Sequence, residues 1–362
     1  MKRRAVAFAL PAAWLLRASP VDAADVPAGV RPRTLVFPRD HGAHPETRIE
    51  WWYVTGALAA GSVEHGFQIT FFRSRTEVAR DHPSAFAAKQ LLFAHAAVTD
   101  VAARRLRHDQ RLAREGFGIA SAATDDTRVA VRDWSLAREG PLERSRYRTR
   151  VAAAGFAFDL EMQATQPPLL QGDAGYSRKG PRPQQASHYV SEPQLDVRGR
   201  LVLDGARLDV RGRAWLDHEW SDELLDPQAV GWDWIGMNLD DGSALTAFRL
   251  RRADGSALWA GGSFRSAAGA LRDFGPDEVR FEAGRVWRSA ATGAGYPVEW
   301  RVTTPAGAFV VRALVDAQEL DSRASTGTVY WEGLSELLDA QGRRVGRGYL
   351  EMTGYAQRLR LG

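Results

Sequence analysis

The sequence contains no cysteine among its 362 residues. Disulfide bonds, thiol nucleophiles, iron–sulfur clusters and cysteine-ligated zinc are therefore excluded. The chain also lacks the HExxH pattern of zinc enzymes, the GxSxG pattern of serine hydrolases, a phosphate-binding loop and a strand-linked GxGxxG pattern. No motif remains that would hold a cofactor or a metal ion, and we expect neither.

Long hydrophobic runs are scarce as well. The run that follows the basic start of the chain covers only residues 5–16, which is too short to cross the roughly 30 Å of hydrocarbon in a bilayer. Because small residues follow this run, we predict a signal peptide at residues 1–23 and a linker at residues 24–40. The protein is then periplasmic or secreted and has no stable membrane anchor. A buried first helix is the alternative interpretation of the run.

Charge of one sign is in only slight excess once the predicted signal peptide is removed. Four of the 48 basic residues and one of the 44 acidic residues lie within residues 1–23. Apart from a short stretch at residues 104–107, the rest of the chain has no concentrated basic segment. Nucleic acid, which is bound through clustered Lys and Arg, is therefore not an expected partner.

Glycine and aromatic residues are abundant, with 34 Gly, 12 Trp, 15 Phe and 8 Tyr. Apolar and polar residues alternate in many short segments, such as FAFDLEM at residues 156–162, as they do in strands with one buried face. Asp-Gly and Gly-Gly pairs, which favour tight turns, recur between these segments. The pattern predicts an all-β protein of short antiparallel strands, arranged as a sandwich or a barrel.

A weak internal repeat indicates two similar units. A WWY segment followed by TFFR in the first half of the chain recurs as WDW followed by TAFR in the second half. We divide the chain into an N-terminal all-β unit at residues 41–222 and a C-terminal one at residues 223–362. Pro, Gly and Gln cluster at residues 166–193, and we expect this irregular segment to join the units.

The segment WLDHEWS contains the first candidates for chemistry. If it continues a strand, His218 and Trp220 share the apolar face, whereas Asp217 and Glu219 face the opposite way. A buried imidazole needs partners for both ring nitrogens, and its pKa shifts with burial, as in general acids and bases. The alternative is a core histidine that bonds to a backbone carbonyl.

A second cluster, Trp232-Asp233-Trp234, places two indoles on one strand face and a carboxyl group on the other. Burying a carboxylate without a donor is costly, and His218 is one candidate donor for Asp233. We therefore expect a His/Asp pair at the mouth of a pocket, with Asp233 or Glu219 orienting His218. In the alternative, Asp233 caps a loop amide.

The remaining candidates for ligand contact lie in strand-like segments. By alternation, Trp51 and Trp52 face opposite ways, so that one indole lines the interior and the other seals an outer face or the junction of the units. The additional candidates are Glu50, His95, His188 and Tyr189.

Several of these segments, taken in order, resemble the AttH-like group of bacterial proteins, which is related to carotenoid 1,2-hydratase (hydroxyneurosporene synthase). The resemblance runs from about residue 40 to Tyr355 and rests on HPETRIEWWYVTG, QITFFR, AHAAVTD, SHY, WLDHEWS, GWDW and YWE. It implies a pair of lipocalin-like β-barrels. It also implies relatives that act on apolar polyenes without a cofactor, by hydration of a terminal double bond or by cyclisation.

The resemblance also bears on the site. The family's His-x-Trp element matches His218 and Trp220, whereas a Tyr-x-Asp element expected on a following strand is missing, and residues 246–249 stand roughly where it would fall. This departure and the predicted signal peptide both argue against carotenoid hydration itself.

Together these observations give two hypotheses. In the first, a periplasmic protein encloses a lipid, terpenoid or polyene and acts on it as a hydratase, isomerase or cyclase. There, His218 is the acid or base and Trp220, Trp232 and Trp234 form a π-wall that stabilises developing positive charge. In the second, it is a non-enzymatic carrier that works with an envelope ABC transporter. A structural adhesion protein is a third reading.

Overall fold

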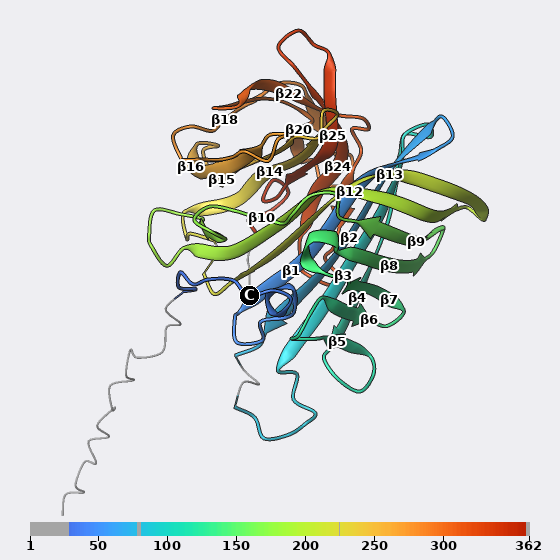
Figure 1. Cartoon of the computed structure of the whole chain (residues 1–362), viewed down its shortest axis with the longest axis vertical. Coiled ribbons are helices and arrows are strands. Elements are labelled where there is room, and N and C mark those ends of the chain that lie inside the picture. Colours follow the sequence, from blue (N-terminus) through green and yellow to red (C-terminus); the bar gives the residue numbers. More distant parts are fainter. Residues whose placement is uncertain (1–28, 78–80, 224, 360–362) are drawn as a thin grey trace, which may run out of the picture.

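The computed structural model describes residues 29–77, 81–223 and 225–359. They form an antiparallel all-β fold of two lipocalin-like barrels, which confirms the predicted fold class (Figure 1). No helix within these ranges is long and apolar enough to cross a membrane. The predicted signal peptide at residues 1–23 lies outside the described residues.

The first barrel is a 13-stranded sheet with the strand order β4-β3-β2-β1-β13-β12-β9-β8-β7-β6-β5, and β10 and β11 also pair with β12. The 3₁₀ turns η1 (Arg39–His41) and η2 (Leu142–Arg144) accompany it. Its strands are β1 (Ile49–Ala60), β2 (Val63–Arg75), β3 (Gln90–Asp100), β4 (Arg105–Arg114), β5 (Ala120–Ala122), β6 (Arg128–Val131), β7 (Trp134–Glu139), β8 (Arg146–Ala153), β9 (Phe156–Gln163), β10 (Leu169–Leu170), β11 (Tyr176–Arg178), β12 (Ala186–Leu203) and β13 (Ala206–Ser221).

The second barrel is a 10-stranded sheet with the order β17-β16-β15-β14-β25-β24-β22-β21-β18, in which β23 also pairs with β24. A separate hairpin is formed by β19 (Val286–Arg288) and β20 (Gly295–Pro297). The strands of the sheet are β14 (Ala229–Leu239), β15 (Ala244–Arg252), β16 (Ala257–Arg265), β17 (Leu271–Phe274), β18 (Arg280–Ala283), β21 (Glu299–Thr304), β22 (Gly307–Ala313), β23 (Glu319–Asp321), β24 (Val329–Leu338) and β25 (Arg344–Met352).

Each barrel has its own apolar core, built by the alternation of side chains along the strands. In β9, Phe156, Phe158, Leu160 and Met162 are all buried in the first core, and the residues between them are partly exposed. The second core gathers Ile235 and other apolar residues of β14 to β25. Every second residue of a strand is thus left to face outward.

The chain passes from one barrel to the other between the end of β13 at Ser221 and the start of β14 at Ala229. The segment at residues 166–193, expected to join the units, instead belongs to the first sheet, where β10 and β11 pair with β12. Its Pro and Gly residues make the turns around these short strands, which is why its composition resembles that of a linker.

The outward faces of the two barrels pack against each other. Where β2 meets β24 and β25, residue 66 must be glycine, because a Cβ there would lie 2.5 Å from Tyr349 Oη and 2.9 Å from Leu334 Cβ. The Thr99 hydroxyl donates a hydrogen bond of 2.7 Å to Gln318 Oε1 across the same contact. The faces that would be solvent-exposed in an isolated barrel therefore meet in the middle of the molecule.

Candidate functional site

A cavity of about 560 Å³ lies between the two barrels. Its wall includes residues of β1, β2, β3 and β13 from the first barrel and of β14, β15, β24 and β25 from the second. Aromatic rings come from both sides, among them Trp51, Tyr53, Trp232, Trp234 and Phe248. A volume of this size is typical of pockets for small apolar ligands.

The structure divides the predicted site residues into two groups. Eight line the cavity: Glu50, Trp51, His95, Tyr189, Asp217, Glu219, Trp232 and Trp234. The other five are buried elsewhere: Trp52, His188, His218, Trp220 and Asp233. Alternation explains the division along β13. Asp217 and Glu219 face the cavity, whereas His218 and Trp220 face the interior of the first barrel.

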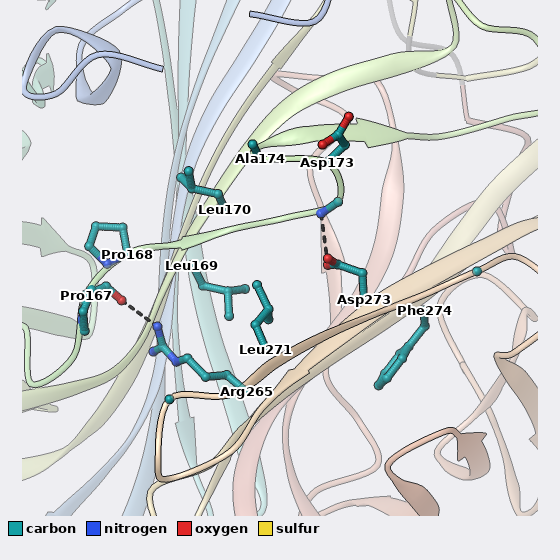
Figure 2. Close-up of a pocket in the computed structure, with 13 residues that line it drawn as sticks. Pro167, Pro168, Leu169, Leu170, Asp173, Ala174, Arg265, Leu271, Asp273 and Phe274 are labelled. Atoms are coloured by element: carbon teal, nitrogen blue, oxygen red, sulfur yellow. Dashed lines mark hydrogen bonds between the residues drawn. The ribbon is translucent and has the colours of Figure 1, made fainter. Parts of the chain in front are cut away.

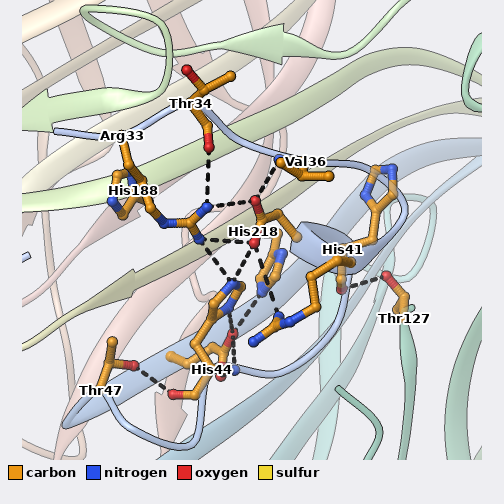
Figure 3. A network of polar contacts seen from close by, with 12 residues as sticks. Arg33, Thr34, Val36, His41, His44, Thr47, Thr127, His188 and His218 are labelled. Carbon is orange, nitrogen blue, oxygen red and sulfur yellow. Dashed lines mark hydrogen bonds and ion pairs between the residues drawn. The ribbon is translucent and has the colours of Figure 1, made fainter. Parts of the chain in front are cut away.

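His218 is held by Glu50, not by the partners that the sequence suggested. Its Nε2 lies 2.9 Å from Glu50 Oε1, within the polar network that also contains His44 (Figure 3). Its ring stacks on Trp52 with centroids 4.7 Å apart. The strand register causes this pairing, since β1 lies beside β13 and places Trp52 opposite His218. The expected orientation of His218 by Asp233 or Glu219 is therefore wrong.

Asp233 lies inside the second barrel, on the face of β14 opposite to Trp232 and Trp234. Its carboxylate accepts hydrogen bonds from Arg249 Nε at 2.7 Å, from Arg251 Nη1 at 3.2 Å and from the Tyr355 hydroxyl at 2.8 Å. Arg249 is its direct neighbour on β15. Two guanidinium groups thus stabilise the buried charge, and it neither faces the cavity nor caps a loop.

Glu50 is saturated with donors. His44 Nδ1 lies 2.8 Å from its Oε1, and Arg73 Nε and the His44 backbone amide donate to its Oε2 at 2.7 and 2.9 Å. Burial alone would raise the pKa of Glu50, but hydrogen bonds from His218 and His44 and the charge of Arg73 hold it well below its usual range. Glu50 is therefore an ionised, fully satisfied structural carboxylate.

The pKa values of the two histidines in this cluster are shifted in opposite directions. Burial lowers the pKa of His218 in spite of its bond to Glu50. Burial also acts to lower the pKa of His44, but hydrogen bonds to Asp40 and Glu50 outweigh it and raise that pKa. His218 is thus neutral and donates from Nε2, and its Nδ1 is buried without a hydrogen-bond partner within the described residues.

Glu50 and the two histidines that contact it are the residues best placed to hold a cation. In the described part of the chain, His44, Glu50 and His218 bring one ligand atom each within 4.8 Å of one another. However, Glu50 Oε1 already accepts from both rings, and the Arg73 guanidinium occupies its other oxygen. Because Arg73 already supplies positive charge here, the arrangement fits a cation poorly.

The cavity wall also carries carboxyl groups with donors. Asp217 accepts hydrogen bonds from Trp215 Nε1 at 2.7 Å, from Ser191 at 2.5 Å and from Tyr189 at 2.8 Å. Glu219 lies 3.0 Å from the ammonium group of Lys179. Burial raises the pKa of Asp217 to about 7, although its three donors act to lower it.

Two further carboxyl groups face the cavity, and sequence reasoning missed them as site residues. Glu332 on β24 and Glu351 on β25 are directly opposite each other in the sheet and both line the cavity. Glu332 is only 3% exposed, and its Oε1 has no hydrogen-bond partner in the described ranges. Burial, followed by repulsion from Glu351, raises the pKa of Glu332 well above its usual value.

His95 connects the two barrels at one end of the cavity. Its Nδ1 lies 2.9 Å from the Tyr330 hydroxyl and its Nε2 2.8 Å from Ser325 Oγ, both in the second half of the chain. Burial lowers its pKa to about 3, so the ring is neutral. Ser325 donates onward to Gln110, which leaves His95 as a bridging group within the wall.

A second hollow, of about 870 Å³, lies where the segment after Pro167 meets β16 and β17 (Figure 2). Arg265 Nη1 donates to the Pro167 carbonyl at 2.6 Å, and the Gly172 amide donates to Asp273 at 3.3 Å. It holds none of the predicted site residues. The cavity between the barrels is therefore the better candidate.

Known proteins resemble this chain in sequence and in fold. A family model described as AttH-like matches residues 28–355. Comparison with curated proteins gives no match. A crystal structure of a candidate AttH from Nitrosomonas europaea is 49% identical, covers 90% of this chain and 98% of its own, and has a TM-score of 0.83. These matches confirm the resemblance inferred from the sequence motifs.

Two more distant structures share the fold. Kievitone hydratase from Nectria haematococca is 14% identical, with a TM-score of 0.69 over 90% of this chain and 94% of its own. CghA in complex with Sch210972 is 15% identical, with a TM-score of 0.55 over 88% of this chain and 90% of its own. At these identities the comparisons establish the two-barrel fold alone.

Proposed function

The chain belongs to the AttH-like family, and from this premise we propose that it binds an apolar small molecule in the cavity between its barrels and carries out acid–base chemistry on it. The substrate class is a lipid, terpenoid or polyene. The reaction class is hydration or isomerisation of a C=C bond without a cofactor. The observation that carries the proposal is an aromatic cavity whose wall contains buried carboxyl groups.

The lining suits an apolar guest. Trp232, Trp234 and Phe248 present ring faces, and burying apolar ligand surface against them contributes about 25 cal/mol per Å². Aromatic faces also stabilise positive charge that develops on carbon. The wall thus supports both the binding of a hydrocarbon and a cationic transition state.

The chemistry requires a group that can give a proton in an apolar setting. Carboxyl groups acquire this property when burial raises their pKa towards neutrality, as for Asp217 and Glu351, whose pKa values lie at about 7. His218 lies on the other face of β13 and does not line the cavity, so we give it a positioning role through Glu50.

We also propose a periplasmic location, which rests on the predicted signal peptide at residues 1–23. The alternative function is a non-enzymatic carrier that delivers an apolar molecule to an envelope ABC transporter. The apolar lining favours this alternative as much as it favours an enzyme, because burial alone would hold a cargo. The two functions differ in whether the bound molecule is changed.

The test begins with the full chain purified from its own periplasm and examined by native mass spectrometry for a retained lipid or terpenoid. Trp232→Ala should reduce ligand occupancy about tenfold, a loss of about 1.4 kcal/mol of binding free energy. Trp287→Ala is the matched control, because Trp287 is also a partly buried indole but packs in the core of the second barrel.

Incubation in D₂O then separates the two functions. An enzyme of the proposed class returns the ligand with deuterium on carbon or with added water, whereas a carrier returns it unchanged. Loss of occupancy in both tryptophan variants, or a wild-type protein that retains nothing and binds no isoprenoid, would contradict the proposal.

A further inference from the structure

We propose that Glu332 and Glu351 form a carboxyl dyad that is the proton donor of the cavity. The inference rests on the proposed function, which it extends by naming the acid. It starts from a contrast among the acids of the cavity wall. Asp217 has three side-chain donors and Glu219 has an ammonium group. Glu332 and Glu351, in contrast, have Tyr53 and Trp232 as neutral donors and no cation partner within the described residues.

The geometry of the dyad follows from the register of three strands. Glu351 on β25 lies directly opposite Glu332 on β24 and directly opposite Trp234 on β14. Directly opposed side chains have Cβ atoms about 5 Å apart, so the two carboxyl groups can approach each other on the cavity face of the sheet.

The dyad has no counter-charge. Within the described residues, no Lys, Arg or His nitrogen lies within 4 Å of either carboxyl group, in contrast to the ion pairs of Glu50, Glu219 and Asp233. One oxygen of Glu332 is buried without a hydrogen-bond partner. Two ionised carboxylates in this position would repel each other at high cost, whereas protonated ones are tolerated.

The titratable groups that surround the dyad do not all act on it in one direction. They are Tyr53 on β1, Asp217 and Glu219 on β13, Tyr330 on β24 and Tyr349 on β25. The negative charges of Asp217 and Glu219 favour its protonated form, whereas the hydrogen bond from Tyr53 acts to lower the pKa of Glu332. Burial, together with the negative charges of Asp217 and Glu219, raises the pKa of Glu351 to about 7. Burial also raises the pKa of the three tyrosines, which therefore remain neutral and bring no charge.

The proton transfer is balanced without a cofactor. The π electrons of the alkene take the proton of one carboxyl group, so that a C–H bond forms, an O–H bond breaks and a carbocation is left beside Trp234. The remaining carboxyl group donates a hydrogen bond to the new carboxylate. Water adds to the cation, its excess proton returns to the dyad, and the product is an alcohol. Loss of a neighbouring proton instead gives an isomerised alkene.

The first experiment tests whether the dyad holds protons. Infrared spectra of the full chain should contain a protonated-carboxyl band that Glu332→Gln and Glu351→Gln each reduce at about pH 6. Glu336→Gln is the matched control on β24, because Glu336 pairs with Arg312 and Arg347 and has a cation of its own. A band that neither dyad variant changes would overturn the proposal.

The second experiment tests the transfer with farnesol, an isoprenoid with a terminal trisubstituted double bond, in D₂O. We expect the wild type and Glu336→Gln to place deuterium on a farnesol carbon. Glu332→Gln and Glu351→Gln should bind farnesol with the wild-type Kd and lose deuteration by at least about a hundredfold, a typical contribution of a general acid.

The outcomes separate this proposal from the one on which it rests. Deuteration that persists in both glutamine variants overturns the dyad and leaves the proposed enzyme standing. Binding without deuteration in the wild type overturns the dyad as a donor and favours the carrier. A failure to bind farnesol or any periplasmic ligand overturns the proposed function, and the infrared band then decides alone whether the dyad holds its protons.

Discussion

Two clusters of buried carboxyl groups lie a few strands apart and have opposite environments. Glu50 is surrounded by His44, His218 and Arg73, whereas Glu332 and Glu351 face each other and an apolar cavity. The first cluster fixes a negative charge by supplying donors. The second supplies only neutral donors and no cation within the described residues, and this keeps its carboxyl groups protonated. Burial alone therefore does not decide whether an acid serves structure or proton transfer, and the supply of donors does.

The largest expected effect comes from a variant that disrupts the cluster around Glu50. Glu50→Ala removes the carboxylate and leaves the buried Arg73 guanidinium without its ion-pair partner, which should cost about 3–5 kcal/mol of unfolding free energy. Urea denaturation measures this change. Asp159→Ala, which removes an exposed partner of Arg148, should cost less than about 1 kcal/mol and serves as the control. Equal losses of unfolding free energy in Glu50→Ala and Asp159→Ala would show that the buried cluster around Glu50 contributes no more than an exposed ion pair.

The second prediction concerns the pH dependence of stability. The pKa of Glu351 is raised to about 7 from its ordinary value of 4.5, so the folded state binds its proton more tightly than the unfolded state does. The contribution of Glu351 to the free energy of unfolding is fully present below about pH 4.5 and is lost as the pH rises through 7. Glu351→Gln should remove this loss and be more stable than wild type by on the order of 2 kcal/mol at about pH 8.

Thermal unfolding between about pH 4 and 8 measures the difference, with Glu336→Gln as the variant that keeps the wild-type slope. If Glu351→Gln and the wild type lose stability in parallel as the pH rises, the pKa of Glu351 is not raised in the folded state and the two clusters do not differ as described.

The smallest expected effect concerns His218. His218→Ala removes one of several donors to Glu50 and should cost about 1–2 kcal/mol of unfolding free energy. His218→Gln keeps a side-chain N–H donor and should recover part of this loss. Farnesol binding, measured by native mass spectrometry, should stay at the wild-type Kd in both variants. A loss of deuteration with full stability in His218→Ala would instead place His218 in the chemistry.

Strand alternation predicted much of this arrangement. It separated His218 and Trp220 from Asp217 and Glu219, and it placed Trp51 and Trp52 on opposite faces, because side-chain period depends on local geometry alone. It could not identify the partner of His218. That partner comes from β1, more than 160 residues away in sequence, and depends on which strands become neighbours when the sheet closes.

The location of the cavity was also beyond local reasoning. The sequence predicted a pocket with His218 at its mouth, whereas the cavity lies between the barrels and its wall is made largely of outward-facing residues from both sheets. The dyad, in contrast, left a signal in the sequence. Glu332 and Glu351 lie at nearly equal distances from the turn at residues 339–343, so a hairpin centred there predicts that they are opposite each other.

The cavity has a mechanical consequence because each barrel supplies only part of its wall. A molecule held there touches both halves of the chain and acts as a tether between them. Calorimetry of the occupied protein should therefore give a single unfolding transition at higher temperature, since neither half can melt without releasing the guest. If the two halves were separated and mixed in solution, they would have to re-form the whole contact between the barrels before they could bind a ligand.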